Sequence, residues 1–331
     1  MTRLVALLVV VLCMGCSNNT GTEKYQSKRD KVENVHQKVK EVAIKDVLIG
    51  AVSRLYLIDD YLIICDYKSF DKLIHIFNKN SFKYLTSVAY KGEGPREIAV
   101  VGHIGTDEAN RVFYVSDHGK QCIFTYKLDS VLVDSSYMPA VKIKFDKSRF
   151  PSEYMYVNDT LSYGRIIEPI GNSDFKPSVA KWNMKTGEVT PMKYEHPQIE
   201  KKRMLTAASV KHGIYVECYN YHDLMTICDL NGNLKYNIYG PNWDNRKSNR
   251  IVYYSKPVFC NDRIVVAYSG RENLPNDGYS TQLLIFDING DYLKTLETGY
   301  RISDFCFDKD NNRIVMSLDD EIQFATLSLD E

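Results

Sequence analysis

The chain has 331 residues and balances 42 Lys and Arg against 42 Asp and Glu. This balance leaves no overall charge with which to attract nucleic acid or an anionic membrane surface, so neither is expected to bind through bulk charge. Aromatic residues make up 12% of the chain, including 24 tyrosines, and this composition favours strands over helices.

The first residues indicate export. A short basic start precedes an apolar run over residues 4–12, which is too short for a membrane-spanning helix. The run ends in CMGCSNN, where Gly15 precedes Cys16. This order is typical of a bacterial lipoprotein signal, in which residues 1–15 are removed and Cys16 is acylated. We therefore expect a lipid anchor at Cys16, and an ordinary signal peptide or an uncleaved anchor is the alternative.

Residues 16–38 are polar and almost free of large apolar side chains. Such a segment buries too little apolar surface to offset the entropy lost on ordering. We therefore expect a polar tether between the lipid and a folded domain that covers residues 39–331.

Six cysteines remain beyond the signal region. They are Cys65, Cys122, Cys218, Cys228, Cys260 and Cys306. Their spacing is not that of a small disulfide scaffold, so we interpret them as small apolar fillers of strands. A disulfide between Cys218 and Cys228 across one hairpin stays open as an alternative.

A repeat of about fifty residues runs through the folded domain. Six times, a turn rich in Asp, Asn or Gly precedes a β-rich run. The turns are aligned on Asp60, Asn110, Asp159, His212, Asp262 and Asn312. Because the steps are 50, 49, 53, 50 and 50 residues, the period indicates one structural unit repeated six times.

Each unit also carries further strand-like runs, several of them separated by hairpin signals such as Asn231-Gly232 and Asn289-Gly290. Four antiparallel strands repeated six times predict an all-β, six-bladed β-propeller. A two-sheet sandwich does not explain a six-fold period. The last unit has only three strands, so we expect residues 39–47 to close it as the fourth strand.

The stretch YKGEGPREI, at residues 90–98, falls between the fourth strand of blade one and the first strand of blade two. With the strands of a blade labelled A to D from the centre outward, it is a D–A connection. D–A connections and B–C turns share one face of a propeller, where ligands generally bind. No helix and no Lys-Ser/Thr pair follow, so a phosphate-binding P-loop is excluded.

These features together resemble a known family. The lipoprotein signal, the polar tether, the six-fold period and the sequence GEGPRE at residues 92–97 resemble the TolB-like six-bladed propeller lipoproteins of Bacteroides-type bacteria. The resemblance covers essentially the whole mature chain. It implies a lipoprotein of the cell envelope, periplasmic or surface-exposed, and analogy with TolB implies binding of a protein or ligand there.

Basic and aromatic residues gather at the connections of the D–A face. Guanidinium groups converging on the channel mouth are suited to an acidic ligand or partner segment, although loop arginines also pair with neighbours. The predicted ligand-binding residues are Arg96, Glu97, Arg149, Arg203, Arg250, Arg301, His118, Tyr221 and His222.

Signals for catalysis and metal binding are weak. Asp308, Asp310 and Asn312 resemble the start of a calcium loop, but Arg313 stands where such a loop needs Gly. No catalytic residue, metal or cofactor is predicted. We expect a monomeric binding or scaffolding module for an envelope protein, peptide or glycan. A hydrolase or lyase with carboxylates and His in the channel is the alternative.

Overall fold

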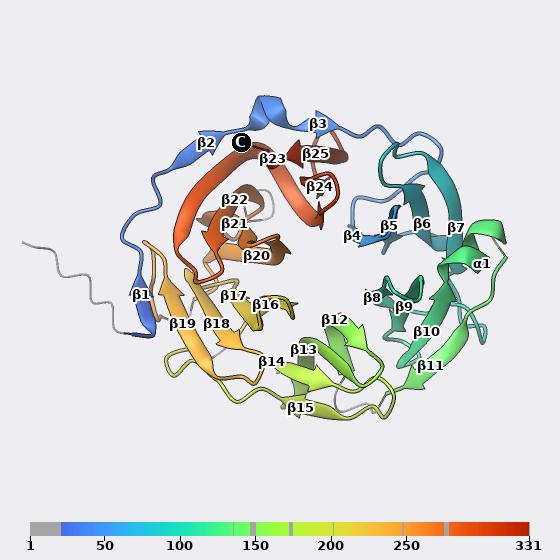
Figure 1. Ribbon diagram of the computed structural model, residues 1–331, viewed down its shortest axis with the longest axis horizontal. Helices are drawn as coiled ribbons and strands as arrows, with labels where there is room; N and C mark the ends of the chain where they lie inside the picture. Colours follow the sequence, from blue (N-terminus) through green and yellow to red (C-terminus); the bar gives the residue numbers. More distant parts are fainter. Residues whose placement is uncertain are drawn as a thin grey trace, which may run out of the picture.

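A computed structural model describes residues 21–134, 136–145, 150–171, 175–200, 202–246, 248–274 and 278–330. Six twisted blades surround a central axis in the order of the chain, with blades 5 and 6 joined into one sheet, and the first strand of each blade lies nearest that axis (Figure 1). The predicted six-bladed propeller is therefore confirmed. The signal at residues 1–15 and the acylation site Cys16 lie outside the described residues.

Blades 1 to 3 each contain four antiparallel strands. Blade 1 contains β4 (Ser53–Ile58), β5 (Tyr61–Asp66), β6 (Lys72–Asn78) and β7 (Tyr84–Tyr90). Blade 2 contains β8 (Val101–Asp107), β9 (Val112–Asp117), β10 (Cys122–Lys127) and β11 (Ala140–Lys144), with helix α1 (Leu128–Val133) between the last two. Blade 3 contains β12 (Phe150–Asn158), β13 (Leu161–Pro169), β14 (Phe175–Trp182) and β15 (Val189–Pro191).

Blades 5 and 6 share one long strand, whereas blade 4 is a sheet of its own. Blade 4 contains β16 (Met204–Ser209), β17 (Ile214–Tyr219), β18 (Leu224–Asp229) and β19 (Leu234–Tyr239). Blade 5 contains β20 (Ile251–Cys260), β21 (Arg263–Glu272), β22 (Ser280–Asp287) and the first part of β23 (Tyr292–Asp308). The second part of β23 is the A strand of blade 6, followed by β24 (Arg313–Leu318) and β25 (Phe324–Ser328). Gly299, at φ +74°, lies where β23 passes from one blade to the next.

The closing strand lies where the sequence predicts it. β3 (Lys40–Glu41) pairs antiparallel with β25, with Ala325 opposite Glu41, and the backbone N–H of Val42 donates to the carbonyl of Phe324. The N-terminal part of the chain therefore supplies the fourth strand of blade 6. This pairing closes the ring without leaving the edge of β25 open.

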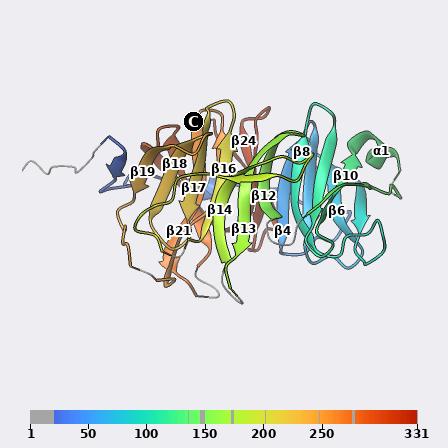
Figure 2. The ribbon, with the colours of Figure 1, turned by 90° about the horizontal axis from the view of Figure 1, so that it is seen from below.

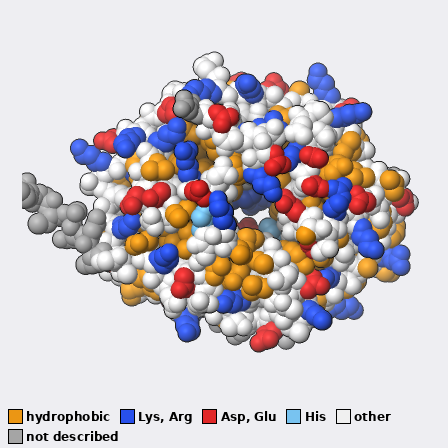
Figure 3. Space-filling view, in the orientation of Figure 1, with side chains coloured by type: hydrophobic (Ala, Val, Ile, Leu, Met, Phe, Trp, Pro, Cys, Tyr) orange, Lys and Arg blue, Asp and Glu red, His pale blue; other side chains and the backbone are white. Residues whose placement is uncertain are grey.

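The turns also follow the repeat. All six aligned residues lie between the A and B strands of their blades. The predicted hairpin glycines Gly232 and Gly290 have φ values of +82° and +83°, which glycine adopts without strain. The A–B and C–D turns share one face, here called the A–B face, and the B–C turns and D–A connections share the other, the D–A face. Figure 2 shows the flattened disc from the side, and Figure 3 views the A–B face, which is hollowed at its centre.

Buried aspartates hold the D–A connections in blades 1 and 2. Asp66, at the end of β5, accepts hydrogen bonds from the backbone N–H of Gly50 at 2.8 Å and of two residues of its own turn. Asp117, at the end of β9, accepts four backbone N–H groups, including that of Ala99 at 2.8 Å. Each carboxylate therefore fixes a B–C turn and the neighbouring connection together.

Residues 21–42 form a strap along the outer edges of three blades (Figure 1). β1 (Glu23–Tyr25) pairs parallel with β19, and β2 (Val32–Asn34) pairs parallel with β23. A single turn of 3-10 helix, η1 (His36–Lys38), precedes β3. The expectation of an unordered tether is therefore wrong for residues 21–38. Composition alone did not reveal that open strand edges supply backbone partners for a polar segment.

Arg29 fastens the strap to the propeller. Its Nη1 donates to Asp223 Oδ1 at 2.8 Å, and the rings of Tyr254, Tyr268 and Phe286 lie 5.4–5.8 Å from the guanidinium carbon. The side chain of Arg29 is 7% exposed and that of Asp223 is fully buried. The strap therefore contributes a charged group to the packing between blades 4 and 5.

The six cysteines of the described residues are free and buried. Cys218 lies opposite Met225, and Cys228 lies opposite Tyr215, so the alternative of a cross-strand disulfide between these two cysteines is wrong. In the part of the chain that the structure describes, no helix is long and apolar enough to cross a membrane.

Candidate functional site

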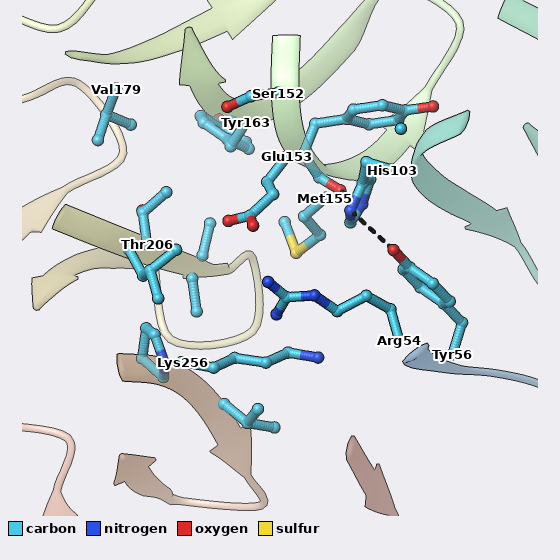
Figure 4. A pocket seen from close by; sticks show the side chains of 18 of the residues that line it. Arg54, Tyr56, His103, Ser152, Glu153, Met155, Tyr163, Val179, Thr206 and Lys256 are labelled. Carbon is cyan, nitrogen blue, oxygen red and sulfur yellow. Dashed lines mark hydrogen bonds between the residues drawn. The ribbon is translucent and has the colours of Figure 1, made fainter. Parts of the chain in front are cut away.

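The central channel contains a cavity of about 700 Å³ lined mainly by the first strands of blades 1 to 5. This volume is within the range of pockets that hold small molecules. Figure 4 shows the ends of Arg54, Glu153 and Lys256 pointing into the same space from three different blades.

Two of these charged groups share one buried carboxylate. Asp304, on β23, accepts from Arg54 Nη1 at 3.2 Å, and the same oxygen lies 2.9 Å from Lys256 Nζ in an ion pair. Its other oxygen accepts the backbone N–H of Leu55 at 2.7 Å. Burial alone lowers the pKa of Arg54, but Asp304 and then Glu153 raise it above its ordinary value, so the guanidinium stays charged.

The carboxylate of Glu153 forms an ion pair with a different cation, Arg165. Its Oε1 lies 3.5 Å from Nη2 of Arg165, a residue of β13 behind the channel wall. Arg165 is fixed by two further hydrogen bonds, to the hydroxyl of Ser152 and to the carbonyl of Met204. The carboxylate of Glu153 is therefore held against one side of the channel.

His103 contributes a neutral ring. Its Nε2 lies 2.7 Å from the carbonyl oxygen of Tyr154, so it carries the proton, and Nδ1 accepts from the hydroxyl of Tyr56 at 3.4 Å. Burial lowers the pKa of His103 to about 4. His118 also lines the channel, and burial lowers its pKa as well.

Two adjoining hollows lie on the D–A face over blades 4 and 5. Arg203, Tyr221 and His222 line a hollow of about 620 Å³. Tyr221 and Arg250 line a second one of about 840 Å³. Tyr221 and Ser248 belong to both, so the hollows meet along Tyr221.

An aromatic cluster supports the floor of these hollows. The ring of Trp243 lies 4.7 Å from that of Tyr239, 5.8 Å from that of His196 and 5.9 Å from that of His222. His222 Nδ1 donates to the carbonyl of Asp244 at 3.0 Å. Burial lowers the pKa of His196 to about 4, and its Nε2 lies 3.1 Å from the hydroxyl of Tyr239.

The predicted ligand-binding residues do not form one ring. The structure brings Arg203, Tyr221, His222 and Arg250 together at the two hollows. Arg250 donates to Glu272 at 2.6 Å, while Arg203 has no ion pair with any residue among those described. Arg301 lies apart from the hollows, where its Nε donates to the carbonyl of Asp319. Arg149 lies outside the described residues.

The GEGPRE loop is held together by its own side chains. Glu97 Oε2 accepts the backbone N–H of Gly94 at 2.8 Å, and Lys120 donates to the carbonyls of Gly94 and Glu97. A methyl group on Gly92 would collide with the Glu97 carboxylate. Arg96 is exposed. Glu97 therefore stabilises this connection from inside the loop.

Lys79, from blade 1, and Arg313 pair with the aspartates of the turn that resembles a calcium loop. Lys79 Nζ lies 2.5 Å from Asp310 and 3.6 Å from Asp308, while Arg313 Nε donates to Asp308 at 2.9 Å. The interpretation as an A–B turn is confirmed, because the turn joins β23 to β24. Within the described ranges, no group of three or more His, Cys, Asp or Glu is placed to hold a metal.

His103, Glu153 and Lys256 were not predicted from the sequence to line the channel. Each lies on an A strand, in the blade position that faces the centre. A polar residue in the middle of each predicted A strand was the available signal. The bulges in β8, β12 and β20 shift the alternation of inward and outward side chains, so simple alternation would not have assigned them reliably.

The comparisons with known proteins agree with this architecture. A family described as a 6-bladed beta-propeller matches residues 42–176. No curated protein matches the chain at a significant level.

Solved structures extend the similarity to most of the chain. A Bacteroides fragilis protein described as exported aligns with a TM-score of 0.54 and 13% identity, over 90% of this chain and 88% of its own. A DUF4221 family member from Bacteroides vulgatus aligns with a TM-score of 0.54 and 13% identity, over 88% and 98%. A luciferin-regenerating enzyme aligns with a TM-score of 0.58 and 11% identity, over 88% and 95%. At these identities the similarity shows the fold alone.

Proposed function

We propose that the protein is a TolB-like propeller lipoprotein of the bacterial cell envelope that binds an oligosaccharide on its D–A face without transforming it. The observation that carries the proposal is the pair of adjoining hollows that meet along Tyr221. Together they form an elongated depression, which fits an extended ligand better than a compact one.

The lining of the hollows favours a sugar over other extended ligands. Their walls combine the aromatic side chains Tyr221 and Trp243 with the amides of Gln198, Asn245 and Asn249. An aromatic face packs against the apolar face of a sugar ring, while amides both donate to and accept from hydroxyl groups. Arg203 adds a cation for an acidic sugar.

A glycan array tests this proposal. We expect the purified protein to bind a restricted set of oligosaccharides, and Tyr221→Ala and Arg203→Gln to weaken that binding by about tenfold or more. Arg301→Gln is the matched control, because Arg301 lies outside both hollows. An array on which the wild type binds nothing, or on which all variants bind equally, would contradict the proposal. Selective binding of a peptide library instead would reassign the face to peptides.

The lipid anchor at Cys16 is part of the proposal. The sequence order around Cys16 supports it, and the structural similarity to an exported protein of Bacteroides fragilis is consistent with it. Only six residues separate Cys16 from Glu23, the first residue of β1. Fully extended, this linker spans at most roughly 25 Å. The rim of blade 4 would then lie close to the membrane.

Metabolic labelling with a fatty-acid analogue tests the anchor in a bacterial host. We expect the wild type to incorporate the label and to sediment with membranes, and Cys16→Ala to do neither. An unlabelled wild type would exclude acylation while leaving the sugar-binding proposal intact.

A further inference from the structure

The central channel carries a positive charge that its own carboxylates do not neutralise. Arg54 and Lys256 both bind Asp304, so this pair of cations has one surplus charge. Glu153, across the channel, is paired with Arg165. Counting these five groups gives three cations against two carboxylates.

The surplus charge faces the cavity. Asp304 has a fully buried side chain, whereas those of Arg54 and Lys256 are 36% and 28% exposed. Arg54 and Lys256 line the cavity, and Asp304 and Arg165 lie behind its wall. A molecule in the channel therefore meets the ends of two cations and the carboxylate of Glu153, with Asp304 hidden from it, so one surplus positive charge faces the cavity.

Donor groups remain available on both cations. Arg54 uses Nη1 for Asp304, while the Nζ of Lys256, which carries three protons, lies 2.9 Å from the same carboxylate oxygen. Because both side chains are fixed by the same buried carboxylate, they are already positioned before a ligand arrives, which limits the entropy lost on binding. Figure 4 shows the two ends directed toward a common space.

The rest of the cavity is mainly apolar. Aromatic and aliphatic side chains line it, including Tyr67, Met155, Val179, Leu205, Val258 and Phe259. The ring of His103 adds no charge, because burial lowers its pKa to about 4 and keeps it neutral. The lining therefore matches a ligand with an apolar body and a single anionic end.

We propose that the channel is a second binding site, which takes a small apolar monocarboxylate with its carboxylate between Arg54 and Lys256. This site is separate from the hollows on the D–A face and does not depend on the sugar-binding proposal. A guanidinium and an ammonium around one carboxylate are charge-assisted donors in a partly dehydrated setting, which strengthens such hydrogen bonds.

The test is calorimetric titration of the purified protein with four acids, butyrate, octanoate, phenylacetate and 4-phenylbutyrate, each beside its neutral amide. We expect at least one acid to bind saturably with 1:1 stoichiometry. Its amide should bind about tenfold or more weakly. Rising salt concentration should weaken binding of the acid and leave binding of the amide unchanged. These comparisons use the wild type, so they do not depend on a variant that folds.

Variants locate the site. We expect Lys256→Met to weaken binding of the acid about tenfold and to leave binding of the amide unchanged. Thr206→Trp, which fills the cavity, should abolish binding of both. Arg203→Gln is the control, because Arg203 lines the hollow on the D–A face and not the channel. Binding of none of the four acids at millimolar concentration, or equal binding of acid and amide, would overturn the proposal.

Discussion

Arg29 and Asp223 join parts of the chain that are 194 residues apart, through a hydrogen bond of 2.8 Å between Nη1 and Oδ1. Both side chains are buried, and Asp223 also accepts the backbone N–H of Asn242, which lies in the connection between blades 4 and 5. The N-terminal strap therefore supports the same part of the propeller that carries the two hollows.

Replacing Arg29 should destabilise the protein strongly. Arg29→Met leaves the Asp223 carboxylate buried without its cation, and breaking a buried pair in this way costs about 3–5 kcal/mol. Lys38→Met is the matched control, since Lys38 pairs with Glu33 at the surface and should change stability by less than about 1 kcal/mol. Urea unfolding of the two variants measures the difference, and equal losses would contradict the role of Arg29.

Deleting residues 21–38 should cause self-association. The deletion removes β1 and β2 and leaves the outer edges of β19 and β23 open to pair with another molecule. Light scattering after size-exclusion chromatography should show dimers or larger species and a lower melting temperature than the intact chain. A monomeric deletion variant with unchanged melting temperature would show that the strap protects no edge.

The fold should weaken as the pH falls through the range between 6.5 and 4. Burial lowers the pKa of His196 from 6.5 to about 4 in the folded state. Below pH 6.5 the unfolded chain binds a proton that the folded chain does not, so stability is present above that pH and is lost toward pH 4. The protonation of His196 accounts for a loss of at most about 3 kcal/mol in the free energy of unfolding.

His196→Gln tests this assignment. The variant should flatten part of the decline in unfolding free energy between pH 6.5 and 4, although it also removes the contact with Tyr239 and lowers stability at pH 7. An unchanged slope would show that His196 is protonated in the folded protein or does not control the decline. His103, with a similarly lowered pKa, should account for a further part of the slope.

Substitutions of Gly92 and Glu97 in the GEGPRE loop should have non-additive effects on the free energy of unfolding. Gly92→Ala alone places a methyl group against the Glu97 carboxylate, and overpacking of this kind costs about 1–3 kcal/mol. Combining it with Glu97→Ala removes the clash, so the double variant should be less destabilised than the sum of the two single changes. If urea unfolding shows that the two single changes in unfolding free energy add up to that of the double variant, Glu97 does not occupy the loop interior.

The repeat made the fold predictable from the sequence. Each blade places a turn residue such as Asp60 or His212 at the same point between its A and B strands, so the local signal recurs six times and errors in one unit are corrected by the others. The closing strand was predictable as well, because blade 6 had only three strands of its own. Both inferences rest on regular patterns within the chain.

The strap and the channel charges were not predictable in the same way. β1 and β2 have no hydrophobic alternation, and they are strands because β19 and β23 offer backbone partners. Asp304 binds cations that precede it by 250 and 48 residues, Arg54 and Lys256. The arginines of the D–A face were recognisable as a group, but only the structure separates Arg203 and Arg250 from Arg301.

The most direct test of the sugar-binding account is calorimetric titration of an oligosaccharide selected on the array into the wild type, Tyr221→Ala and Arg301→Gln. The account predicts 1:1 binding to the wild type and to Arg301→Gln with equal affinity, and a loss of about tenfold or more for Tyr221→Ala. Equal affinity of all three proteins would contradict it, because the ligand would then bind away from the hollows that meet along Tyr221.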